Sequence, residues 1–159
     1  MTYTKNDKGF SLIELLIVVA IIGIIAAIAI PNLLASRRAA NEGSAQQSLR
    51  TMASAEATYR STAGNGSYGD VNSMMGQSLI DSTLGGGTKS GYSYTTGAVP
   101  AASTTDFVIG ATPTTTSGVT ATGTRDFCID QTGVLKANPA ASGTVPTDCT
   151  VAGFAAIGN

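Results

Sequence analysis

The distribution of apolar residues divides the chain into two unlike parts. Residues 15–30 carry neither a charge nor a polar side chain, and the apolar character persists to Ala35. A helix of about 20 such residues is roughly 30 Å long, which is enough to cross a bilayer. The rest of the chain is rich in Gly, Ala, Ser and Thr, and we do not expect it to lie in a membrane.

Residues 36–61 also favour a helix, but an amphipathic one. Ala45, Leu49, Met52 and Tyr59 form a narrow apolar stripe at helical spacing. A continuous helix of about 50 residues would be roughly 80 Å long. Because so small a protein cannot cover such a rod, most of the helix is expected to pack on something else.

Charged pairs and a glycine turn refine this second half of the helix. Arg38/Glu42 and Glu56/Arg60 have the i,i+4 spacing that supports an exposed helix face, each by only a few tenths of a kcal/mol. Residues 64–66, Gly-Asn-Gly, are a plausible end of the helix. Within its first half, Pro31 is expected to kink the helix because it lacks an N–H, and Gly23 is a second weak point.

The remainder of the chain predicts a connector followed by a small sheet. Residues 63–90 are rich in Gly and Ser, and Asp70 is placed to cap a short helix carrying Val71. Residues 131–133 are expected to turn the last strand run into a hairpin. The fold class is therefore α+β, a long N-terminal helix laid against an antiparallel sheet with candidate strands at residues 91–96, 106–113 and 125–136.

Cys128 and Cys149 are the two cysteines, and they are far apart with no Cys-x-x-Cys motif or histidine nearby. A zinc site is therefore improbable, and a disulfide in an oxidising compartment is the better interpretation. Two unpaired buried thiols are the alternative. A disulfide would close a C-terminal loop, which is our candidate for a surface exposed to partners.

The composition excludes several classes of function. The chain has 9 Lys+Arg, 10 Asp+Glu and no histidine, so it has no basic surface typical of nucleic-acid binding and lacks the commonest general base. No nucleophile is paired with a base, and we expect no enzyme activity, cofactor or metal. Asp126, Asp130 and Asp148 are a candidate calcium site, but scattered surface acids are the simpler interpretation.

The most informative segment is Lys8-Gly9-Phe10-Ser11-Leu12-Ile13-Glu14, directly before the apolar run. A carboxylate beside a membrane span costs roughly 2.5–3.5 kcal/mol on insertion scales, so Glu14 is a candidate functional residue. It requires a cationic partner, and the apolar segment offers none before Arg37. Cleavage of the chain before Phe10 would create an α-amino group four residues from Glu14.

This segment resembles the prepilin signature of the type IV pilin and pseudopilin superfamily, most closely that of a type IVa major pilin. The resemblance implies cleavage between Gly9 and Phe10, N-methylation of Phe10, and a role for Glu14 in assembly and register. It also implies that Gly23 and Pro31 flank a stretch that can unwind in the filament. The aromatic residues that follow this proline in some relatives are absent, which weakens any electron-conducting function.

The resemblance also implies an organisation and a set of partners. A cleaved leader (1–9) would precede a transmembrane and filament-core helix (10–35), an amphipathic half-helix (36–62), the connector (63–90) and the sheet with its C-terminal loop (91–159). The precursor would cross the bacterial inner membrane once, and the mature chain would polymerise with itself into an extracellular fimbrium for adhesion or motility. Its expected partners are the lipid bilayer, a prepilin peptidase/N-methyltransferase, and an inner-membrane assembly platform with its ATPase.

Three alternatives stay open at this point. Within the superfamily, the chain could instead be a pseudopilin of a type II secretion system. In a different class, it would be a membrane-anchored or secreted binding module that never polymerises. Ala27-Ile28-Ala29 also has the form of an ordinary signal-peptidase site, which would remove the apolar segment and leave a secreted domain.

Overall fold

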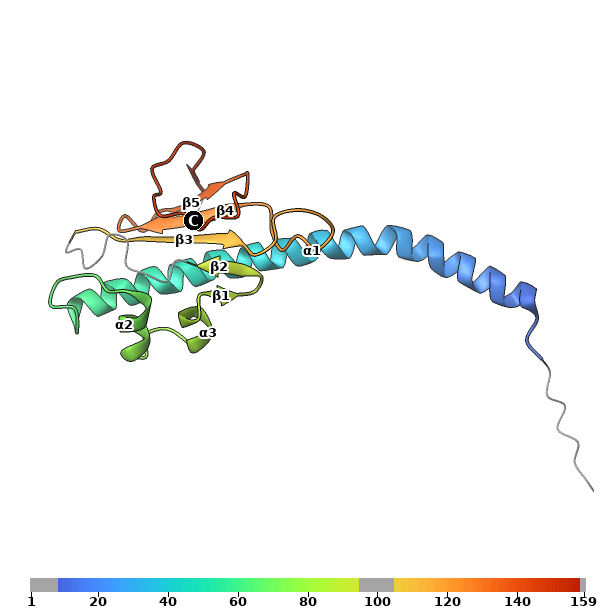
Figure 1. The fold of residues 1–159 in the computed structure, drawn as a ribbon, viewed down its shortest axis with the longest axis horizontal. Coiled ribbons are helices and arrows are strands. Elements are labelled where there is room, and N and C mark those ends of the chain that lie inside the picture. The colour runs from blue at the N-terminus through green and yellow to red at the C-terminus, as the bar shows by residue number, and fades with distance from the viewer. Residues whose placement is uncertain (1–8, 95–104, 158–159) are drawn as a thin grey trace, which may run out of the picture. The chain divides into compact units, whose positions relative to one another are not determined.

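The computed structural model describes residues 9–94 and 105–157 (Figure 1). Contacts along the chain separate two compact units, Met1–Ala35 and Ser36–Asn159. The first unit contains the apolar part of a long helix. The second contains the rest of that helix, two short helices and the sheet. This organisation confirms the predicted α+β class.

Helix α1 runs from Leu12 to Ser61 and is 50 residues long. It continues through Gly23 and Pro31, although the proline removes one intrahelical N–H donor. The side-chain Nδ2 of Asn32 donates to the Ile28 carbonyl at 3.1 Å and adds a hydrogen bond to this turn. Neither position therefore ends the helix in the single chain, and unwinding in a filament stays a prediction.

The connector contains more regular structure than its composition indicated. Asp70 caps α2 (Val71–Gly76) by accepting from the Ser73 N–H at 2.7 Å, as predicted. A second helix, α3 (Ser82–Gly85), is capped in the same way by Asp81, and its sequence did not lead us to expect it. Strand β1 (Thr88–Lys89) follows directly and was also missed.

The six strands in the described residues form an antiparallel meander in which each strand pairs with its neighbour in sequence. The predicted strand runs correspond to β2, β3, β4 and β5, and the turn at residues 131–133 joins β4 to β5. Residues 95 and 96 of the first predicted run lie outside the described residues. A short final strand was not predicted. After β1, the strands are β2 (Tyr92–Tyr94), β3 (Val108–Pro113), β4 (Asp126–Asp130), β5 (Leu135–Asn138) and β6 (Ala155–Ala156).

One face of the sheet packs against the second half of α1. Ala45, Leu49 and Met52 of the predicted stripe are fully buried, and Tyr59 packs at the edge of the same core. The core continues into the short helices and the sheet. Its other large members are Val71, Met74, Ile80, Leu84, Tyr92, Tyr94, Phe107, Ile109, Phe127, Ile129 and Leu135.

The opposite face of the sheet carries the C-terminal loop. Cys128 lies between the core residues Phe127 and Ile129, so strand alternation points its side chain away from α1. Gly110 is the register partner of Cys128 on β3. A Cβ at Gly110 would collide with the backbone carbonyl of Pro146, which shows how closely this loop approaches the sheet.

We expect Gly110→Ala to destabilise the fold by about 1–3 kcal/mol, because the added methyl group meets backbone and must displace the loop. Gly43→Ala is the matched control. Gly43 is exposed on α1 with open space around it, and this change should stabilise by about 0.5–1 kcal/mol. Urea unfolding of the detergent-solubilised chain measures both, and equal effects of the two changes would contradict the close loop packing.

Candidate functional site

The predicted cleavage junction lies at the exposed beginning of α1. Gly9 and Phe10 precede the helix, and Phe10 is 78% exposed. A Cβ built on Gly9 would meet nothing within 4 Å. The peptide bond between these residues is therefore open to a processing enzyme, although cleavage there stays a prediction.

Glu14 has a structural partner that the charge-based argument missed. Its Oε2 accepts a hydrogen bond from the backbone N–H of Ser11 at 3.0 Å. Ser11 directly precedes α1, and its carbonyl accepts from the Leu15 N–H at 3.2 Å. This is half of a capping box, in which an acid in the first turn satisfies a free N–H at the helix start. The Ser-x-x-Glu spacing of residues 11–14 was the feature of the sequence that could have predicted this bond.

The first half of α1 exposes a continuous apolar surface. The structure contains one helix long and apolar enough to cross a membrane, judged by length and composition among the described residues. Its most apolar stretch has no buried residue in the single chain. The large exposed side chains are Leu12, Ile13, Leu15, Leu16, Ile17, Val18, Val19, Ile21, Ile22, Ile24, Ile25, Ile28, Ile30 and Leu33.

The cysteines form the predicted disulfide, Cys128–Cys149, with Cα atoms 5.6 Å apart. The bond joins β4 to the end of the C-terminal loop. Lys136 on β5 supports the same junction, because its Nζ lies 3.4 Å from the Cys149 carbonyl and 3.1 Å from a carboxylate oxygen of Asp130. The C-terminal segment is therefore held by a covalent bond and by a hydrogen bond from Lys136, which the ion pair with Asp130 keeps in place.

The three aspartates of the candidate calcium site have separate partners. Asp126 is fully buried and accepts from Thr112 Oγ1 at 2.6 Å and from the Ser142 N–H at 2.8 Å. Asp130 is also buried, so the interpretation of these residues as surface acids was wrong for both. Asp148 is exposed and bonds Thr150. Among the described residues, no group of three or more potential ligands has the arrangement of a metal site.

The predicted i,i+4 pair between Arg38 and Glu42 is wrong. Arg38 instead donates to the carbonyls of Ala121 and Gly118, at 3.2 and 2.9 Å. Glu42 is buried and binds Arg125, with the closest N–O distance 2.6 Å. Long-range partners replace the local pair because this side of α1 faces the loop before β4.

Glu42 uses both oxygens of its carboxylate in hydrogen bonds. Its Oε1 accepts from the backbone N–H and the Oγ1 of Thr124, both at 2.9 Å, while Oε2 accepts two hydrogen bonds from Arg125. Burial alone would raise the pKa of Glu42, but these hydrogen bonds outweigh burial and lower it. Nearby, Asn41 donates to the Thr122 carbonyl at 2.9 Å. The loop is thus fixed to α1.

The second predicted pair, Glu56 with Arg60, is also wrong. Glu56 is buried and accepts from the Gly69 N–H at 3.0 Å. Arg60 binds the Gly66 carbonyl at 2.9 Å and lies over the Tyr68 ring. Burial of Glu56 outweighs its hydrogen bond, and the nearby Asp70 adds repulsion, so its pKa is raised.

Comparison with known proteins gives partial matches, of which the family model lies at the N-terminus. Residues 4–30 match the family model described as "Prokaryotic N-terminal methylation motif". The chain is 68% identical over 38 residues to the type IV wide pilus major component PilA4 of Thermus thermophilus, covering 24% of this chain and 29% of that protein. It is 42% identical over 57 residues to the type IV major pilin protein PilA of Myxococcus xanthus, covering 36% and 26% respectively.

A fimbrial protein of Pseudomonas aeruginosa is 79% identical over 28 residues, which is 18% of each chain. In each case the match spans less than a third of the relative's length. The methylation motif is followed in this chain by a long apolar helix and an antiparallel sheet with a C-terminal disulfide. The matches support a type IV pilin, as the sequence motif predicted.

We expect Glu42→Gln to destabilise the fold by about 2–3 kcal/mol at pH 7, because it removes the charge that Arg125 and Thr124 bind. The folded pKa of Glu42 lies below its ordinary value of 4.5. Its ionised form therefore stabilises the fold above pH 4.5, and this contribution is lost as the pH falls through the folded pKa. Near-ultraviolet circular dichroism during urea unfolding measures the difference, which should shrink in acid. A pH-independent difference would contradict this assignment.

Glu56→Gln should have the opposite effect to Glu42→Gln and raise the free energy of unfolding by up to about 1 kcal/mol at pH 7. The folded pKa of Glu56 lies above 4.5, so the protonated carboxyl favours folding below that pH and the benefit disappears as the pH rises. The amide oxygen of Gln can still accept from Gly69. The same unfolding measurements should therefore show wild type and variant converging near pH 4. A large loss of stability of Glu56→Gln at pH 7 would contradict this prediction, because it would show that the ionised Glu56 carboxylate stabilises the fold.

Proposed function

We propose that this chain is a structural subunit of an extracellular type IV pilus-like filament, with no enzyme activity of its own. The observation that carries the proposal is the apolar segment of residues 10–35, which begins in the methylation motif and is exposed in the single chain. Two environments cover such a surface, a lipid bilayer before assembly and the apolar helices of other subunits afterwards.

Membrane retention is consistent with the position of the leader. Cleavage between Gly9 and Phe10 keeps the apolar helix, so the subunit stays in the inner membrane as a single-pass protein until it is assembled. Transfer of the helix from lipid into a bundle of apolar helices changes its hydrophobic environment little. Movement between the two environments is therefore feasible for an assembly platform driven by an ATPase.

Glu14 is the residue we assign to register between subunits. It is the single charged residue of segment 10–35. In a filament its carboxylate would pair with the Phe10 amine of a neighbouring subunit, and such a buried pair gives specificity more reliably than net stability. In the single chain the Ser11 N–H occupies the same carboxylate. The amine of the neighbour would therefore join or replace an existing helix-capping bond.

The mature subunit should begin at Phe10 and carry one added methyl group on its α-amino nitrogen. Mass spectrometry of subunits from sheared surface filaments tests this directly. A mature N-terminus at Ile30, the product of cleavage after Ala29, would exclude the pilin processing route and favour a secreted domain.

Glu14→Ala and Glu14→Gln separate the two roles of this carboxylate. Glutamine can still accept from the Ser11 N–H and keep the cap, but it removes the charge. We expect both variants to insert into the membrane at least as well as wild type and to assemble few filaments, since both lack the intersubunit ion pair.

Filament counts by electron microscopy, normalised to membrane-bound subunit, provide the measurement. Normal assembly of Glu14→Gln together with failure of Glu14→Ala would assign the effect to helix capping rather than to charge. Normal assembly of both variants would contradict any role of Glu14 in register.

A further inference from the structure

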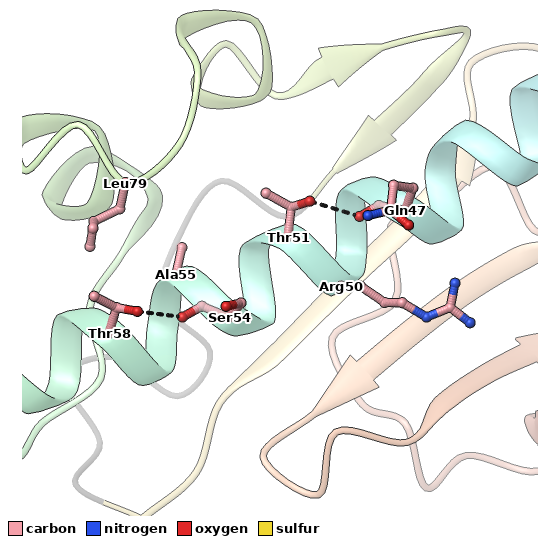
Figure 2. Close-up of a pocket in the computed structure, with 7 residues that line it drawn as sticks. All are labelled: Gln47, Arg50, Thr51, Ser54, Ala55, Thr58 and Leu79. Carbon is pink, nitrogen blue, oxygen red and sulfur yellow. Dashed lines mark hydrogen bonds between the residues drawn. The ribbon is translucent and has the colours of Figure 1, made fainter. Parts of the chain in front are cut away.

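The outer face of α1, on the side away from the sheet, bears a groove of about 360 Å³ beside α2 (Figure 2). Thr51 Oγ1 donates to the Gln47 carbonyl at 3.0 Å and Thr58 Oγ1 donates to the Ser54 carbonyl at 2.9 Å. These hydroxyl protons are satisfied within the helix and lose nothing when the groove is covered. Arg50 and Leu79 also line the groove. They give it a cationic and an apolar side chain for binding.

Arg50 is the charged residue among those that line the groove. Between residues 36 and 61, α1 has two acids, Glu42 and Glu56, and both are buried. Its arginines are exposed or partly exposed, and Figure 2 shows the Arg50 guanidinium extended away from the other labelled side chains. Among the described residues, the ion pairs are Lys89–Asp81, Arg125–Glu42 and Lys136–Asp130, so Arg50 belongs to none of them.

The complementary charge lies on the opposite face of the same unit. Asp148 is exposed in the C-terminal loop, beside the disulfide-bonded Cys149. Its Oδ1 accepts from the N–H and the Oγ1 of Thr150, both at 2.7 Å, which fixes the carboxylate direction. These hydrogen bonds, with a smaller contribution from the charge of Lys136, lower the pKa of Asp148. Asp148 is therefore ionised at neutral pH and is held on a stapled loop.

The other exposed or partly exposed acids described in this second unit are less suited to an intersubunit contact. Asp81 binds Lys89 and caps α3, while Asp70 caps α2. Asp106 uses both oxygens, for Thr105 and Gln131. Asp148 accepts both hydrogen bonds from Thr150 through a single oxygen, which leaves Oδ2 available to a further donor.

We propose that the α1 groove around Arg50 receives the C-terminal loop of a second copy of this chain, with Asp148 of that copy paired to Arg50. The inference rests on the proposed function, since it names the surfaces through which the second units of two subunits meet. The two surfaces lie on opposite faces of the sheet layer, so they cannot meet within one subunit. A contact between different faces repeats from copy to copy and generates an open filament when the rotation does not close.

Reversal of each charge alone and then of both tests the pairing in the full-length chain. Arg50→Glu and Asp148→Arg should each reduce the yield of sheared filaments roughly tenfold, because every contact then holds two like charges. The double variant should recover most of the yield. A non-reducing gel that shows the Cys128–Cys149 bond in membrane-bound subunits controls for folding.

A conservative variant allows the partner of Arg50 to be identified by chemical crosslinking. Arg50→Lys should assemble normally, and zero-length carbodiimide treatment of its filaments should link Lys at position 50 to Asp148 of another subunit, identified by mass spectrometry. A crosslink to a different carboxylate, unchanged filament yield from both single variants, or no recovery in the double variant would overturn the pairing while leaving the filament role intact. Absence of any wild-type filament would instead overturn the proposed function and this contact with it.

Discussion

The apolar surface on the first half of α1 must be covered, and this need determines the environments in which the chain is stable. The side chains from Phe10, just before the helix, to Leu33 form an apolar surface that no other described part of the single chain buries. Burial of apolar area is the dominant favourable term in folding and association, so such a surface is stable only in lipid or against similar helices. The same helix would therefore account for both the membrane retention and the polymerisation that we propose, and for the use of a cleavage site placed before it.

The second unit, by contrast, satisfies its own requirements. The stripe Ala45, Leu49 and Met52 completes a core shared with the sheet, while Glu42 and Arg125 fix the loop that precedes β4. The disulfide and the hydrogen bond from Lys136 to the Cys149 carbonyl hold the C-terminal loop on the far face. Because this unit needs no cover, its outer surfaces are available for contacts between subunits. Helix α1 is common to both units. Its first half must be covered by lipid or by other helices, whereas the unit that contains its second half can be exposed to solvent.

Sequence reasoning was most successful where one residue property repeats along the chain. The apolar run, the stripe at helical spacing, the alternating strands and the Asp70 cap all have local signatures, and the disulfide could be predicted because the chain has just two cysteines. It failed where partners lie far apart in sequence. Glu42 and Arg125 are separated by 83 residues, and the local i,i+4 rule assigned Glu42 to Arg38 instead. The capping bond of Glu14 is different, since its partner is three residues away and the Ser-x-x-Glu pattern is a local signature of it.

The central claim is that residues 10–35 form the core of a polymer. A cryo-electron microscopy reconstruction of sheared filaments tests it most directly. The account predicts a central bundle of helices that contains this segment, with Glu14 of each subunit near the Phe10 amine of a neighbour and the second units outside. A filament whose core is built from the sheet-containing units, or surface filaments that lack this chain altogether, would contradict it.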